Sequence, residues 1–213
     1  MTLIAGFVCP DGFVVAGDTE VQLGDLRFQT TKLIDSPATN ASYRLVIGGA
    51  GWSDYLDEVM QEIVDDVSRF DAPVIVEVDQ AIRDAIGRIH DQNIFQHWEP
   101  GDPARPAVGL IVGLRDATGH RCVWKTADKT VSRVSGCSFV GTGTMIAVHV
   151  SEKLFRDGLP TAMVHHLATQ ILREAKLKCT GVGGNTDTWS VQTADAAPYF
   201  DISSKDKRYL LET

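Results

Sequence analysis

This sequence has few cysteines, a deficit of positive charge and no long apolar run, and each absence excludes a class of protein. The four cysteines, Cys9, Cys122, Cys137 and Cys179, are widely separated and form no CxxC pair. Neither a zinc site nor a disulfide framework is indicated, and we expect reduced, mostly buried thiols. Lysine and arginine total 20 against 28 aspartate and glutamate residues, for a formal net charge of −8. This balance argues against nucleic acid or an anionic membrane surface as a partner.

The beginning of the chain lacks the features of a targeting segment. It has no basic region, and its apolar stretch is interrupted by PDG at residues 10–12. No apolar run approaches the roughly 20 residues that a membrane-spanning helix needs. We therefore expect a cytoplasmic protein. With 213 residues, 44% of them hydrophobic, and no linker-like segment, residues 1–213 are expected to form one domain without a cofactor.

Hydrophobic periodicity predicts strands and helices in blocks. Apolar runs on both sides of PDG predict a β-hairpin, whereas the apolar residues of 52–70 recur every three or four positions, as on one face of a helix. The predicted strands span 3–8, 13–17, 26–34, 43–49, 107–114, 120–126, 129–134, 137–140 and 187–193, and the predicted helices span 52–70, 74–95, a segment starting near 144, and 160–178. Because strands and helices come in blocks, we predict an α+β fold: a four-layer α-β-β-α sandwich of antiparallel sheets with helices outside.

Thr2 has a special chemical setting, because it directly follows the initiator methionine. A small second residue permits removal of Met1, and the new α-amine would titrate near pH ~8, so that it can act as a base at neutral pH. A threonine hydroxyl beside its own terminal amine is one form of activated nucleophile. The alternative is that Thr2 only begins an edge strand, since very many proteins start with Met-Thr.

The residues that follow Thr2 carry a second signal. Gly12–Asp18 reads GFVVAGD and covers the second predicted strand. This stretch resembles the phrase G-x-V-x-A-x-D of the proteasome β-subunit family, including its bacterial and ancestral-type relatives. The spacing from Thr2 to Asp18 equals the family's spacing from nucleophile to catalytic aspartate.

Further matches extend this resemblance through residue 54. Gly24 matches a glycine of the next loop, and Lys32-Leu33-Ile34 matches the family motif that begins with lysine. Residues 48–54 (GGAGWSD) match the glycine-rich turn before the first helix. Together with the order of strands and helices, the resemblance implies the N-terminal nucleophile hydrolase fold.

The resemblance also implies catalytic roles. Thr2 would attack the peptide carbonyl, Lys32 would favour its deprotonated hydroxyl, and Asp18 would keep Lys32 charged and oriented. Gly49 would offer its backbone N–H to the developing oxyanion, although Ala50 could instead hold that position. Taken alone, Asp18 and Lys32 read as a strand-end carboxylate and a solvated lysine.

Three more residues receive roles by the same resemblance. Thr142, in Gly141-Thr142-Gly143, would replace a serine that helps to relay the proton. Ile47 would line the pocket for the residue before the cut, and Gln22 is a second substrate-binding candidate. The same glycines could be read as a dinucleotide loop, G-x-G-x-x-G, but Ile146 occupies the third glycine position and no βαβ unit surrounds it.

One motif departs from the family's pattern. Many members have an aspartate and, three residues later, Ser-Gly-Gly, and these polar groups support the free amine. Here Cys179 and Val182 occupy the two polar positions, while Gly183-Gly184 match. Thr180 is a candidate substitute.

The implied function is that of a threonine endopeptidase in a homo-oligomeric ring, acting on peptides or unfolded proteins, with an ATP-dependent unfoldase as an implied partner. Two alternatives stay open. The altered CTGVGG motif is compatible with a catalytically inactive ring or scaffold subunit, and the N-terminal nucleophile could instead serve a hydrolase of small amides. No metal is expected.

Overall fold

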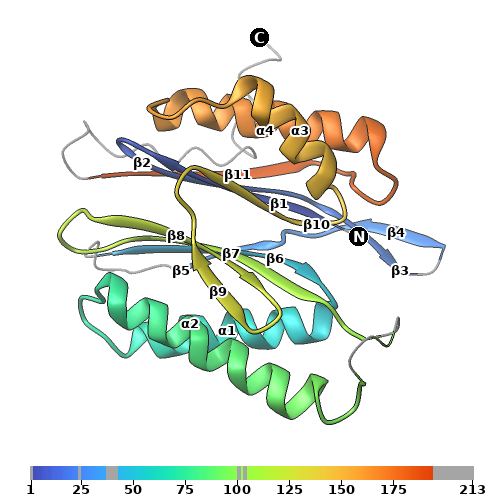
Figure 1. Cartoon of the computed structure of the whole chain (residues 1–213). Helices are drawn as coiled ribbons and strands as arrows, with labels where there is room; N and C mark the ends of the chain where they lie inside the picture. The colour runs from blue at the N-terminus through green and yellow to red at the C-terminus, as the bar shows by residue number, and fades with distance from the viewer. Residues whose placement is uncertain (1, 24, 37–42, 100–101, 103–104, 194–213) are drawn as a thin grey trace.

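The computed structural model describes residues 2–23, 25–36, 43–99, 102 and 105–193. These residues form four layers, with two β-sheets face to face and a pair of helices on each outer side (Figure 1). The predicted α-β-β-α sandwich is therefore confirmed. Met1, Gly24 and the chain from residue 194, on which the sequence analysis also drew, lie outside the described residues.

The first sheet contains four antiparallel strands in the order β10-β1-β2-β11. Their bounds are Leu3–Cys9 for β1, Gly12–Asp18 for β2, Cys137–Gly141 for β10 and Thr186–Gln192 for β11. Residues 10–11 connect β1 and β2, so the PDG turn joins two central strands as predicted. Helices α3 (Thr144–Leu154) and α4 (Thr161–Lys178) cover the outer face of this sheet.

The second sheet contains five antiparallel strands in the order β5-β6-β7-β8-β9. Their bounds are Leu33–Ser36, Arg44–Gly51, Val108–Arg115, Arg121–Ala127 and Thr130–Arg133. Helices α1 (Ser53–Ser68) and α2 (Ile75–Ile89) cover its outer face, and α2 continues into a π-helical turn, η1 (His90–Ile94). The apolar stripe predicted for the first helix is the buried face of α1, which includes Leu56, Val59 and Ile63.

The space between the sheets is closely packed. Ile4, Phe13 and Val15 of the first sheet join Val46 and Ile111 of the second in one buried apolar cluster. Glycine is required at position 113 of this interface, because a Cβ placed there would lie 2.3 Å from Cε2 of Phe13. This close packing fixes the position of one sheet relative to the other. It therefore also fixes which strand ends of the two sheets lie next to each other.

One predicted element differs from the structure. The strand expected over 26–34 is two strands, and a further strand was not predicted: β3 (Glu20–Leu23) pairs with β4 (Leu26–Gln29) in a separate hairpin, and β5 begins only at Leu33. All four residues of β4 are exposed. The alternation of apolar and polar residues in EVQL and LRFQ is typical of strands, but it shows neither that β4 ends at Gln29 nor that the hairpin is separate from the two main sheets.

Candidate active site

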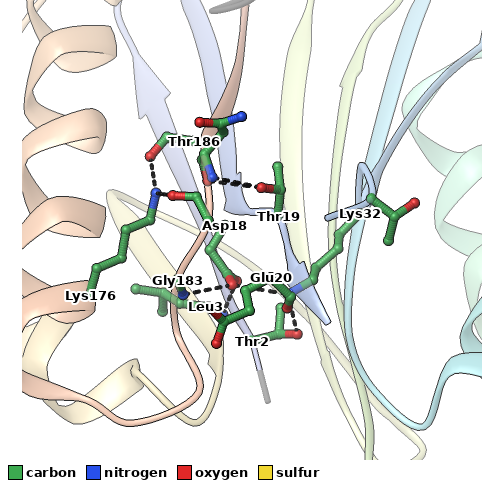
Figure 2. Close-up of polar contacts among 12 residues, drawn as sticks. Thr2, Leu3, Asp18, Thr19, Glu20, Lys32, Lys176, Gly183 and Thr186 are labelled. Atoms are coloured by element: carbon green, nitrogen blue, oxygen red, sulfur yellow. Dashed lines mark hydrogen bonds and ion pairs between the residues drawn. The ribbon is translucent and has the colours of Figure 1, made fainter. Parts of the chain in front are cut away.

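Thr2, Asp18 and Lys32 meet at the edge where strands of both sheets end (Figure 2). The Lys32 ammonium donates hydrogen bonds to Thr2 Oγ1 at 2.8 Å and to Asp18 Oδ2 at 3.0 Å. It also donates to the backbone carbonyl of Glu20 at 2.5 Å. One cation thus joins the hydroxyl of Thr2 to a carboxylate at the far end of the first hairpin.

Strand geometry explains why these three residues come together. Thr2 directly precedes β1, Asp18 ends β2, and Lys32 directly precedes β5. Because β1 and β2 are antiparallel neighbours, the start of one lies beside the end of the other. Lys32 reaches this point from the facing sheet, so the site depends on how the two sheets are stacked.

Asp18 has donors on both carboxylate oxygens. Oδ1 accepts from the backbone N–H of Leu3 at 2.8 Å, while Oδ2 accepts from Lys32 and from the backbone N–H of Gly183 at 3.2 Å. Its side chain is fully buried, and the side chain of Lys32 is only 9% exposed. A buried ion pair is stable only when its remaining polar atoms are also satisfied, and Asp18 meets this condition.

The environment of Lys32 changes its acidity. Burial lowers the pKa of Lys32 below its ordinary value of 10.5. The charge of Asp18 and its hydrogen bond oppose this lowering of the pKa, and the charge of Glu20 does so as well. A lysine ammonium that is held against a hydroxyl by a buried carboxylate is suited to stabilise an alkoxide.

A cavity of about 670 Å³ opens beside Thr2. Ala50 and Gly51, at the end of β6, line it, as do Thr142 and Thr144 at the start of α3. This volume is within the range of ligand-binding clefts. A substrate in this cavity would lie beside Thr2.

Gly141 brings the β10–α3 turn against Thr2. It pairs with Leu3 at the end of β10, and its φ is +101°. A Cβ at this position would lie 2.1 Å from the carbonyl oxygen of Thr2, so both the backbone conformation and the space require glycine. Thr142 follows directly, which accounts for its place in the cavity of Thr2.

The other predicted site residues lie differently. The N–H of Gly49 donates to the carbonyl of Lys32 at 3.2 Å, and a side chain at this position would face Leu56 and Met60 of α1. Ala50, the alternative, lines the cavity of Thr2, whereas Gly49 does not.

The two substrate-binding candidates also lie outside the lining of that cavity. Ile47 is fully buried in the cluster between β6 and helices α1 and α2. Gln22 is exposed on β3, where it pairs with Arg27 of β4. Their contact with a substrate stays a prediction.

The altered CTGVGG motif contacts Asp18 through its glycine Gly183. Val182 is buried in the apolar cluster beneath α3 and α4, and Cys179 is half-buried at the end of α4. Neither side chain is among the hydrogen-bond partners of Asp18. The motif instead contributes the N–H of Gly183, which is a backbone group and does not depend on the missing side chains.

Lys176 was missed by sequence reasoning. It lies in the last turn of α4 and lines a second cavity, of about 510 Å³, together with Glu20, Gly183 and Gly184. Basic residues are common in the last turn of a helix, where they complement the helix dipole. Nothing in its sequence setting therefore marks Lys176 as a neighbour of the site.

Two negative findings concern the described residues. Among them, no group of three or more His, Cys, Asp or Glu side chains is arranged to hold a metal ion. Over the same part of the chain, no helix is long and apolar enough to cross a membrane.

The fold of this chain matches solved structures of Anbu proteins. Anbu from Hyphomicrobium sp. strain MC1 is 15% identical and gives a TM-score of 0.76 over 98% of this chain and 90% of that chain. Anbu (ancestral beta-subunit) from Yersinia bercovieri is 10% identical, with a TM-score of 0.74 over 89% of this chain and 81% of that chain. A chain of the helical assembly of the Anbu complex from Pseudomonas aeruginosa is 14% identical, with a TM-score of 0.70 over 98% of this chain and 92% of that chain.

These comparisons correct the assignment to the proteasome β-subunit family. No protein-family model matches the chain, and no curated protein sequence matches it. The assignment rested on short motifs that are strongest within residues 2–54, whereas the solved structures compared above are of Anbu proteins, and the identities to such structures are 10–16%. Likeness at this level shows a shared fold and does not show membership in a family.

Proposed function

We propose that this protein is a threonine-type N-terminal nucleophile hydrolase that cleaves peptide bonds once Met1 has been removed. The observation that carries the proposal is the Lys32 ammonium, which donates both to Thr2 Oγ1 and to Asp18 Oδ2. A surface lysine keeps its charged head in water and would not be expected to hold a buried threonine hydroxyl and a buried carboxylate at once. The fold shared with Anbu structures is compatible with the proposal.

In the first half of the reaction, Thr2 Oγ1 attacks the carbonyl carbon of the substrate peptide bond. The α-amine of Thr2 accepts the hydroxyl proton and then delivers it to the leaving amine, as the C–N bond breaks. The product is an ester between Thr2 and the acyl part of the substrate. Lys32 lowers the energy of the alkoxide through its positive charge, and Asp18 keeps that charge in place.

In the second half, water attacks the ester carbon. The α-amine removes a proton from this water, and the proton passes to Thr2 Oγ1 when the ester bond breaks. The free carboxylic acid leaves and the starting state is restored. Backbone N–H groups at the end of β6 are the candidate donors for the oxyanion, and Ala50 and Gly51 line the cavity of Thr2 there.

We further propose that the protein acts as a homo-oligomer. One structural neighbour, the Anbu complex from Pseudomonas aeruginosa, forms a helical assembly. In this chain, large apolar side chains are exposed on α3 and α4, namely Met145, Met163 and Leu177. Such side chains are typical of surfaces that meet another protein when they lie together. A ring arrangement and an ATP-dependent unfoldase stay predictions.

One observation favours a second candidate, an inactive scaffold subunit. Val182 and Cys179 stand where the resemblance places the polar groups that support a free α-amine, and neither supplies such a group. A scaffold would keep the fold and the assembly without turnover. It would retain Met1 or fail to react at Thr2.

The deciding experiment combines intact mass with an active-site probe. We expect protein from its native host to lack Met1, and a β-lactone or epoxyketone to add one equivalent at Thr2. A Thr2→Ala variant should form no adduct and have no peptidase activity. Retention of Met1 in the host, or full activity of Thr2→Ala, would overturn the proposal.

A further inference from the structure

Lys176 is the second lysine that reaches the surroundings of Asp18. Its ammonium donates to the carbonyl of Gly184 at 2.9 Å and to Thr186 Oγ1 at 2.7 Å (Figure 2). The lysine belongs to α4, whereas both acceptors belong to the turn and strand that follow that helix. These bonds therefore fix the segment 183–186 against the last turn of α4.

The same segment contacts Asp18 and its neighbours at several points. Gly183 donates its N–H to Asp18 Oδ2 at 3.2 Å, and its carbonyl accepts a bond from the N–H of Glu20 at 3.2 Å. Thr186 is the register partner of Asp18 between β11 and β2. Gly184 stands between these contacts with a φ of +68°, so a tight turn separates the two. Contacts that fix this turn therefore also keep the N–H of Gly183 in hydrogen-bonding position on Asp18.

The charge of Lys176 also acts on this region. Burial lowers the pKa of Lys176, while the carboxylates of Asp18, Asp187 and Glu20 oppose that lowering. The positive charge of Lys32 lowers the pKa of Lys176 further. Interaction between two charges is mutual, so a charged Lys176 must also disfavour the charged form of Lys32.

We propose that Lys176 is a positioning residue for the candidate site: it fastens the segment 183–186 to α4 and thereby holds the Gly183 N–H on Asp18, the ion-pair partner of Lys32. This inference rests on the proposed threonine hydrolase and deepens it.

Three substitutions separate the parts of this role. Lys176→Met removes both the bonds and the charge, Lys176→Gln keeps a hydrogen-bond donor without the charge, and Lys176→Arg keeps both. We expect Lys176→Met to lower kcat about tenfold with little change in KM, because Lys176 does not line the cavity of Thr2. Lys176→Arg should recover most of the lost rate.

The pH profile reports the effect of the charge. When a neighbouring cation is lost, the pKa of Lys32 should rise. The alkaline limit of kcat/KM should therefore move to higher pH in both Lys176→Met and Lys176→Gln, and it should stay near the wild-type position in Lys176→Arg. A purely structural role would lower the rate without moving this limit.

Lys178 provides a matched control. It lies two residues further along α4 and lines the same second cavity, but its side chain is 55% exposed and pairs with Glu174 at 3.1 Å. Lys178→Met removes an equal charge from the lining of the same cavity and leaves the hydrogen bonds of Lys176 to Gly184 and Thr186 in place. We expect its rate and its pH limits to match those of the wild-type protein.

A measurement that needs no activity tests the inference separately from the proposed function. Hydrogen exchange at the Gly183 amide, followed by NMR, should be faster in Lys176→Met than in the wild-type and Lys178→Met proteins.

If Lys176→Met fails to fold, Lys176→Gln supplies the comparison through the titration of Lys32. An unchanged Gly183 exchange rate together with an unchanged Lys32 titration would overturn the inference, even if Thr2 proved to be the nucleophile. Faster exchange in a chain that has no peptidase activity would support the inference and count against the proposed function.

Discussion

The Lys32 ammonium lies 2.8 Å from Thr2 Oγ1, and the two residues come from different sheets of the sandwich. Thr2 precedes the first strand of one sheet, and Lys32 precedes an edge strand of the other. The distance between them is therefore set by the packing between the sheets rather than by any local turn. Substitutions in that packing should affect the site as strongly as substitutions near it.

Lys32→Met should abolish most peptidase activity. It removes the cation that we propose stabilises the Thr2 alkoxide, and loss of one such group typically costs about 10²–10³ in kcat. Rates with a peptide substrate, measured on protein that lacks Met1, provide the test. Lys153→Met, on the exposed side of α3, is the control and should leave the rate unchanged. Activity of Lys32→Met close to that of the wild type would contradict the assigned role.

Asp18→Asn should destabilise the protein as well as inactivate it. The substitution leaves the buried Lys32 ammonium without its charge partner, and breaking a buried pair costs about 3–5 kcal/mol. Urea unfolding measures this loss. Asp91→Asn removes one partner of an exposed ion pair, with Lys129, and should cost no more than about 1 kcal/mol. If both substitutions lowered the free energy of unfolding by the same amount, the burial of the Asp18–Lys32 pair would make no additional contribution to stability.

The pH dependence of activity follows from the lowered pKa of Lys32. In the proposed mechanism the active form needs a charged Lys32 and a neutral α-amine, so activity should rise with pH as the α-amine loses its proton, and fall as Lys32 loses its own. Because burial lowers the pKa of Lys32, the falling limb should lie below 10.5. A profile of kcat/KM against pH measures the limb, and a fall that begins only above 10.5 would contradict the prediction.

The lowered pKa also has a consequence for stability. The unfolded chain holds a proton on Lys32 up to about its ordinary pKa of 10.5, whereas the folded chain releases that proton at lower pH. Between the two values the unfolded state binds more protons, so this residue's contribution to the free energy of unfolding becomes more favourable as pH rises. Lys32→Met should remove that contribution from a series of urea unfolding curves at increasing pH.

Gly141→Ala should both destabilise the fold and displace Thr2. The added Cβ would meet the carbonyl of Thr2 at 2.1 Å in a backbone conformation with φ of +101°. Strain and overpacking together should cost about 3 kcal/mol or more. Gly119→Ala is a matched control, because its φ is +85° and no atom lies within 4 Å of its added Cβ. That control should cost only roughly 1–2 kcal/mol, and a similar loss in both variants would show that contact with Thr2 is unimportant.

Periodicity was sufficient for most of the fold. The stripe of α1, with Leu56, Val59 and Ile63, was visible because the buried face of a helix repeats with the period of the helix. The runs on both sides of PDG were visible as continuous apolar segments next to turn residues, and both strands are buried almost throughout. β4 fell within the predicted strand 26–34, but β3 and the break between β4 and β5 were not predicted, because the separation of this hairpin from the main sheets is not encoded in a local pattern. Contacts between sheets, such as Gly113 against Phe13, depend on stacking, which a local pattern does not encode.

The candidate site was visible only where residues follow a fixed spacing. Asp18 and Lys32 could be named from their positions relative to Thr2, and the structure brings both to it. The contribution of Lys176 could not be predicted, because its partners are the backbone carbonyl of Gly184, in a turn, and the hydroxyl of Thr186, at the start of β11. The sequence also could not show whether Gly49 or Ala50 is placed to offer its N–H to an oxyanion. That choice depends on which N–H groups of β6 already form hydrogen bonds with the segment that contains β5.

The bond from the Leu3 N–H to Asp18 Oδ1 has one further consequence. It ties the peptide after Thr2 to the carboxylate, while Lys32 holds the side chain of Thr2 itself. Neither of these contacts passes through the residue before Thr2. In the proposed mechanism, the contacts of Thr2 Oγ1 and Asp18 would thus form independently of the α-amine, and the site would lack only this base until an aminopeptidase removes Met1. The onset of activity would then depend on the timing of that cut, and no rearrangement of the folded protein would be needed.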